Sequence, residues 1–109
     1  MASSVIKKES HFITLFHNEN GLSLPATDIP LNYNRGNFRW LIITIGQSTA
    51  LNRATFLVTG ARNNNYCSAK ISDSVEWAIQ DVYGTSDVIM RINVNSGSNL
   101  RLFDVVGIV

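Results

Sequence analysis

The feature that most constrains this sequence is one long apolar run, Phe38 to Gly46, which reads FRWLIITIG. β-Branched and aromatic residues dominate the run, and a glycine closes it, as is typical of a β-strand. The run is too short to cross a bilayer as a helix, and it has the length of a strand that is buried on much of both faces. We therefore expect it to be the central strand of an all-β domain.

Alternation divides the side chains of this strand between two faces. The two sets are Leu41, Ile43 and Ile45 on one face, and Trp40, Ile42 and Thr44 on the other. We expect one set to face the domain interior and the other to be covered, at least in part, by a second sheet or a neighbouring chain.

Composition supports a packed domain and argues against two classes of partner. The chain has 109 residues, of which 45% are hydrophobic and 16% charged, so we expect one globular domain over residues 1–109, cut from a longer protein. A formal net charge of +1 leaves no basic field to hold a phosphate backbone, so nucleic acid is not an expected partner. We expect neither a signal peptide nor membrane insertion.

Short apolar runs alternate with turns rich in Asn, Ser and Gly along the rest of the chain. The strand candidates are 5–17, with its β-forming residues at 11–16, and 22–24, 54–59, 66–71, 88–94 and 100–109. Asn20-Gly21 predicts a hairpin turn before the short strand at 22–24, and Pro25 and Pro30 predict an irregular segment between them. About eight short strands without a fixed repeat predict an antiparallel β-sandwich of jelly-roll type.

The segment 73–84 has two interpretations. Its apolar residues fit one helix face, with Asp73 and Glu76 as a capping box and Gly84 after the end. A strand would instead place Trp77 and its alternate neighbours on one face, and the surrounding β-rich sequence favours that strand. The sequence alone leaves the choice open.

Residues typical of catalytic or metal sites are sparse. The single cysteine, Cys67, excludes an intrachain disulfide and a cysteine-rich zinc site, and we expect it to be a half-buried strand residue. His11 and His17 are expected at strand margins rather than as metal ligands. Asp104 is expected on an outer face or paired with an arginine such as Arg91 or Arg101. We expect neither cofactor nor metal.

Two loops combine aromatic rings with amide and guanidinium groups, a mixture that carbohydrate sites use for stacking and hydrogen bonding. The candidate ligand-binding residues are Tyr33, Asn34 and Arg35 in the first loop, and Arg62, Asn63, Asn64, Asn65 and Tyr66 in the second. The alternative is that both are ordinary turns, because Asn tolerates turn conformations.

Three segments resemble the distal domains of bacteriophage tail fibres. They are Phe38–Gly46, the lead-in Gly21–Pro25 with Ile29 and Leu31, and the ending Leu100–Val109, which closes on a hydrophobic-glycine-isoleucine pattern. The segment around Trp77 departs from that pattern. The resemblance implies a jelly-roll or β-sandwich tip domain in the virion that forms a homotrimer and binds a bacterial surface polysaccharide or outer protein without catalysis. It transfers no receptor-binding residue.

Two alternative functions remain open at this stage. One is a structural virion domain, such as a capsid, baseplate or fibre-cap component, that binds only its own assembly. The other is a small glycan hydrolase that would need two carboxyl groups across a sugar bond, such as Glu76 and Asp104.

Overall fold

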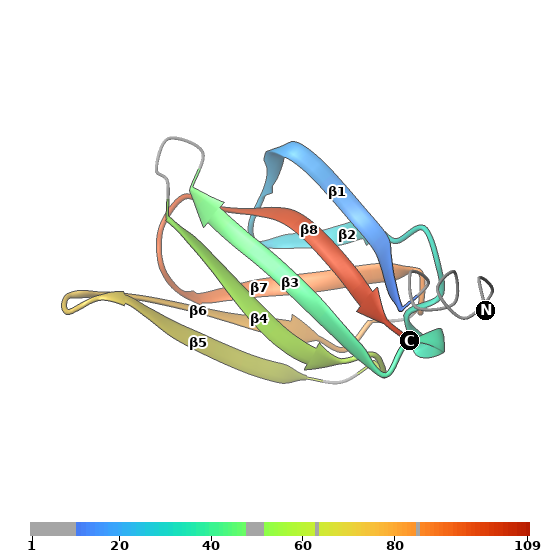
Figure 1. Cartoon of the computed structure of the whole chain (residues 1–109). Coiled ribbons are helices and arrows are strands. Elements are labelled where there is room, and N and C mark those ends of the chain that lie inside the picture. Colours follow the sequence, from blue (N-terminus) through green and yellow to red (C-terminus); the bar gives the residue numbers. More distant parts are fainter. Residues whose placement is uncertain (1–10, 48–51, 63, 85) are drawn as a thin grey trace, which may run out of the picture.

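The computed structural model describes residues 11–47, 52–62, 64–84 and 86–109, which form a two-layer β-sandwich (Figure 1). Within them, sheet A has the strand order β1-β8-β3-β4 and sheet B the order β2-β7-β6-β5, with all pairs antiparallel. The strands are β1 (Phe12–Ser23), β2 (Ala26–Pro30), β3 (Trp40–Gln47), β4 (Arg53–Thr59), β5 (Asn65–Ser72), β6 (Val75–Val82), β7 (Ile89–Ser96) and β8 (Leu100–Ile108). The predicted all-β sandwich of eight strands is confirmed.

The first and last strands wrap around the middle of the chain. β1 pairs with β8 in sheet A, and β2 pairs with β7 in sheet B, so the outer segments of the sequence are nested in the manner of a jelly roll. The inner strands instead form local hairpins, β3 with β4 and β5 with β6. A short 3₁₀ helix, η1 (Arg35–Asn37), connects the two halves between β2 and β3.

The apolar run Phe38–Gly46 supplies most of β3, which lies between β8 and β4 in sheet A. Leu41, Ile43 and Ile45 are fully buried, and they belong to one hydrophobic core with residues of sheet B such as Ile79 and Ile92. The expected interior set is thus confirmed. In the outward set the Trp40 side chain is 42% exposed, whereas Ile42 and Thr44 are partly buried.

The ambiguous segment 73–84 forms strand β6 and the turn before it. Trp77, Ile79 and Asp81 point inward and are buried, whereas Asp73 and Ser74 form the tight turn from β5. β6 pairs with β5 on one side and β7 on the other, and this long-range pairing overrides the local helical periodicity. The helix interpretation is therefore wrong.

The predicted hairpin at Asn20-Gly21 is also wrong, because β1 continues through it as a bulged strand. Gly21 has φ +82°, and a Cβ there would come within 2.7 Å of the Cβ of Arg101 on the paired strand β8. The Arg101 guanidinium also donates to the Gly21 carbonyl oxygen at 2.9 Å. Glycine at this position thus permits a bulge rather than a chain reversal.

The segment between the two prolines is a strand rather than irregular. Ala26–Pro30 forms β2, the edge of sheet B, where Ile29 is fully buried. A proline at the end of an edge strand removes no ladder hydrogen bond that the sheet requires.

Asp104 lies on the outer face of sheet A, as expected, but its partner is a histidine. A carboxylate oxygen of Asp104 is 2.6 Å from Nδ1 of His17 on β1, and both side chains are partly exposed. His17 therefore lies within a strand and not at its margin. An exposed pair of this kind adds little to stability.

Gly60, which follows β4, provides a sharp test of the packing. A Cβ at this position would overlap the backbone carbonyl oxygen of Phe38, and neither backbone segment can yield without disturbing the hydrogen bond from Gly60 to Arg39. We expect Gly60→Ala to lower the free energy of unfolding by about 3 kcal/mol, measured by urea denaturation.

Gly84→Ala is the matched control. A Cβ at Gly84 would meet only ordinary van der Waals contacts, with the nearest atom at 3.5 Å. Its effect should stay within about 1 kcal/mol, and equal losses for the two variants would contradict the packing described here.

Candidate functional site

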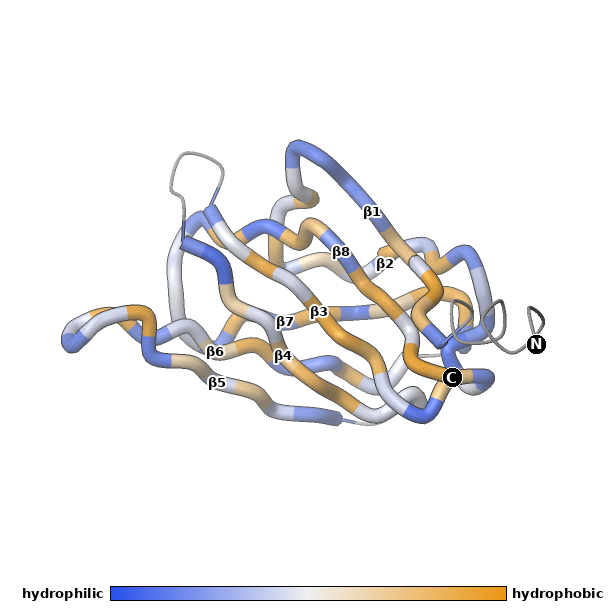
Figure 2. Tube along the Cα trace, in the orientation of Figure 1, coloured by the Kyte–Doolittle hydropathy of each residue, from blue (hydrophilic) through white to orange (hydrophobic). Residues whose placement is uncertain are grey.

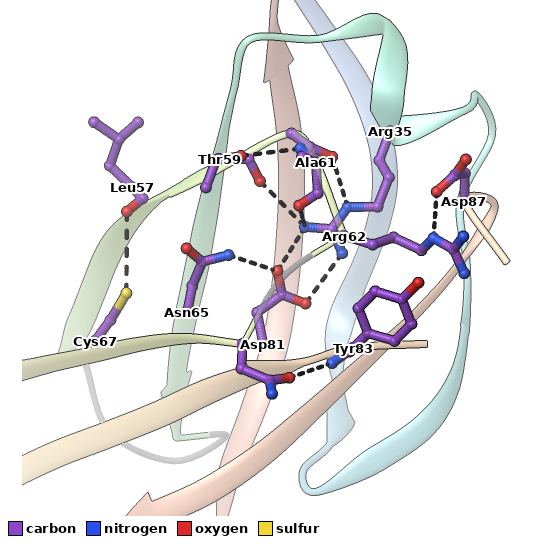
Figure 3. Close-up of polar contacts among 12 residues, drawn as sticks. Arg35, Leu57, Thr59, Ala61, Arg62, Asn65, Cys67, Asp81, Tyr83 and Asp87 are labelled. Carbon is purple, nitrogen blue, oxygen red and sulfur yellow. Dashed lines mark hydrogen bonds and ion pairs between the residues drawn. The ribbon is translucent and has the colours of Figure 1, made fainter. Parts of the chain in front are cut away.

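The two predicted loops meet at one end of the sandwich, around a buried ion pair (Figure 3). The Arg35 side chain of η1 reaches past the β4–β5 turn to Asp81 of β6, and only 2% of Arg35 and none of Asp81 is exposed. Nη1 and Nη2 of Arg35 donate to the two carboxylate oxygens at 3.0 and 2.5 Å. This bidentate geometry is the strongest form of a carboxylate–guanidinium contact.

The remaining donors of Arg35 bind the β4–β5 turn. Nε donates to the Gly60 carbonyl oxygen at 2.9 Å, and Nη2 donates to those of Thr59 and Ala61 at 3.2 and 3.4 Å. Among the described residues, no buried polar side-chain atom lacks a hydrogen-bonding partner. Arg35 therefore holds the end of the fold together, and its burial removes it from the outer surface.

Arg62 joins the β4–β5 turn to the β6–β7 loop. Its Nε lies 2.7 Å from a carboxylate oxygen of Asp87, and its Nη1 donates to the Gly84 carbonyl oxygen at 2.5 Å. The guanidinium carbon also lies 4.9 Å from the ring centroid of Tyr83, which is a cation–π contact. The Arg62 side chain is thus held by contacts within the chain.

Three of the predicted asparagines also make contacts within the chain. Asn34 caps η1 by accepting from the Gly36 amide at 2.7 Å. Asn64 accepts from the Tyr83 amide at 2.6 Å, and Asn65 donates to Asp81 at 3.3 Å. Asn63 lies outside the described residues.

Both tyrosines of the predicted set are exposed, as are Asn34 and Asn64. Tyr33 and Tyr66 are 53% and 61% exposed. Tyr66 points away from the interior of sheet B, because its neighbour Cys67 packs against the core. Tyr83, in the β6–β7 loop, is 56% exposed and was not among the predicted residues.

Part of the outer surface of sheet A is apolar, and we call this part the apolar face. The alternation in the sequence predicted only its β3 residues. Strand register aligns its residues in two adjacent rows across the sheet. Figure 2 shows that hydrophobic residues of both faces are frequent along β3, β4 and β8. The apolar face consists of Phe12, Trp40 and Ile108 in one row, and Ile42, Leu57 and Val106 in the next. Phe12 and Leu57 are 61% and 56% exposed, so much of this surface meets water in the single chain.

The outer face of sheet B is polar by contrast. Tyr66 of β5 lies opposite Gln80 of β6, which lies opposite Asn93 of β7. Arg91 projects from the same face of β7, two residues before Asn93. The two outer surfaces of the sandwich therefore differ in chemistry.

Three residues considered for chemistry lie far from any shared site. Glu76 and Asp104 belong to the outer faces of different sheets, so they cannot flank one sugar bond. Cys67 is half-buried, as expected. Burial is the main cause that raises the pKa of its thiol, and the negative charge of Asp81 raises this pKa further. A raised thiol pKa works against nucleophilic reactivity.

Within the described part of the chain, no three His, Cys, Asp or Glu side chains cluster so that they could hold a metal ion. No helix in the described ranges is long and apolar enough to span a membrane.

Comparison with known proteins gave no match to this chain, whether among protein-family models, curated proteins or solved structures.

The buried pair predicts that substitution of Asp81 costs more stability than substitution of Asp87. Asp81→Asn leaves the buried guanidinium of Arg35 without a counter-charge, so the free energy of unfolding should fall by about 3–5 kcal/mol. Asp87→Asn removes a partly exposed partner of Arg62 and should cost no more than about 1 kcal/mol. Urea denaturation of both variants measures the difference, and equal costs would show that the buried pair does not stabilise the fold.

Proposed function

We propose that this chain is the receptor-binding tip domain of a bacteriophage tail fibre. In this role it sits at the end of the fibre in the virion, forms a homotrimer and attaches to a bacterial surface glycan or protein without catalysis. The observation that carries the proposal is the contrast between the two outer faces, since the apolar face of sheet A suits assembly while the polar face of sheet B stays open to a receptor. The resemblance of Phe38–Gly46 and Leu100–Val109 to fibre tips points the same way.

The apolar face is large enough to matter for assembly. The whole outer face of sheet A, with four strands about 4.8 Å apart and eight residues long, makes a plane of about 500 Å², and the apolar face is the part of it at the Trp40 end. Contacts with neighbouring copies that cover this plane would bury about 500 Å² on each copy, close to the lower limit for a specific protein interface. An apolar patch of a few hundred Å² often marks a contact with another molecule. A closed three-fold arrangement would cover the patch on every copy.

A single charge on the apolar face tests the assembly. Leu57 lies at the β4 end of the second row and is 56% exposed, so Leu57→Lys places an ammonium group on the apolar face without entering the core. We expect light scattering to give three times the chain mass for the original protein and the mass of one chain for the variant.

Ser68→Lys is the matched control, because Ser68 is an exposed strand residue on the outer face of sheet B. This variant should keep the trimer. An original protein that is a monomer at micromolar concentration, or a Leu57→Lys variant that keeps its mass, would contradict trimer formation through this face.

Adsorption to cells tests the attachment role. The fluorescently labelled domain should adsorb to particular bacterial strains and leave the surface polysaccharide of those strains intact. A stable trimer that adsorbs to no strain would support the structural virion domain instead. Degradation of the polysaccharide would support a hydrolase.

A further inference from the structure

We propose that the outer face of sheet B binds an acidic saccharide, one whose sugar ring carries a carboxylate. This inference rests on the proposed attachment function and names the receptor chemistry and the surface that recognises it. The binding surface, here called the sheet B platform, consists of Tyr66, Gln80, Asn93 and Arg91.

Strand register fixes how these side chains are arranged. Tyr66, Gln80 and Asn93 occupy one row across β5, β6 and β7, which spans about 10 Å at ordinary strand spacing. Arg91 lies about 7 Å along β7 from Asn93 on the same face. The platform therefore has the dimensions of a short oligosaccharide lying across the strands.

The row offers the groups that a sugar needs. The Tyr66 ring is 61% exposed and gives a flat apolar surface for sugar C–H groups. The side-chain amides of Gln80 and Asn93 each provide donors and an acceptor for hydroxyl groups, and neither makes a side-chain hydrogen bond to another described residue. A ring beside two available planar amides is suited to a saccharide.

Charge on the platform favours an anionic sugar. No carboxylate among the described residues lies within ion-pairing distance of Arg91. The nearest acidic residue by register is Asp28, in the bulge of β2 opposite Arg91, and its carboxylate accepts from Thr27 at 3.4 Å. Lys70, farther along the face, has Glu76 opposite it. Arg91 can therefore bind a sugar carboxylate through the fork geometry of its guanidinium.

Other occupants fit this surface less well. A nucleic acid would require several cations along a phosphate backbone, and the chain carries a net charge of only +1. A protein partner would require an apolar centre, whereas Gln80 and Asn93 occupy the centre of this row.

The test is nuclear magnetic resonance of the assembled protein with simple sugars. The probes are glucuronate, galacturonate and N-acetylneuraminate at millimolar concentration, with glucose and galactose as neutral sugars and acetate as the charge alone. At least one acidic sugar should shift the side-chain amide signals of Gln80 and Asn93, and acetate and the neutral sugars should bind at least about tenfold more weakly.

Substitutions separate the platform from non-specific attraction. Arg91→Gln should weaken binding of the acidic sugar about tenfold, and Tyr66→Ala should weaken acidic and neutral sugars alike. Arg39→Gln, an exposed arginine before β3, is the matched control and should leave binding unchanged. Asp28→Asn should strengthen binding slightly, because it removes a competing negative charge near Arg91.

Three results would overturn the inference. They are the absence of shifts with all three acidic sugars, equal shifts with acetate, and unchanged binding by Arg91→Gln. If Arg91→Gln and Tyr66→Ala both leave strain-specific adsorption intact, the sheet B platform is rejected. The attachment function would still stand. If the original protein adsorbed to no bacterial strain, that result would instead reject the attachment function itself.

Discussion

The buried contact between Arg35 and Asp81 is the interaction on which one whole end of this sandwich depends. Removing two charges from water costs several kcal/mol per ion, so such a pair is tolerated only with nearly ideal geometry and full hydrogen bonding. Both conditions hold here, because the carboxylate is bound at both oxygens and the guanidinium also binds the carbonyl groups of the β4–β5 turn. The pair therefore stabilises the fold only when η1, β6 and the β4–β5 turn are arranged as they are here.

That arrangement places the loops whose residues were predicted to bind a ligand. Arg35 belongs to η1, Asp81 to β6, and the bound carbonyls to the turn after β4, so the pair joins sheet A to sheet B at this end. The Arg62–Asp87 contact then holds the β6–β7 loop on the outside of the same cluster. Residues of both predicted loops thus stabilise the fold, and the outer surface is left to the tyrosines and to the strand faces.

Sequence periodicity could predict most of the strands but not the buried ion pair. β3, β7 and β8 are predictable because their apolar residues are continuous or alternate with the spacing of a strand. Arg35 and Asp81 are 46 residues apart, and nothing local to either one signals that the other will neutralise it. The same limitation explains Gly21, where the deciding contact is with Arg101 on a strand 80 residues later. β6 was ambiguous because its helical periodicity is local, whereas its strand conformation depends on two distant neighbours.

A two-layer sandwich also explains why the outer faces can differ so much. The core takes one side chain of every two from each strand, so the alternate residues can change without disturbing the packing. In sheet A these residues include two apolar rows beside a polar region that contains Thr44 and Asp104, whereas in sheet B they are mostly polar or charged. Burial of the sheet A face against other copies would stabilise the assembly through apolar area, which needs no particular sequence on the opposite side. The sheet B face would then be free to diverge with the receptor, since neither the core nor the subunit contacts would constrain it.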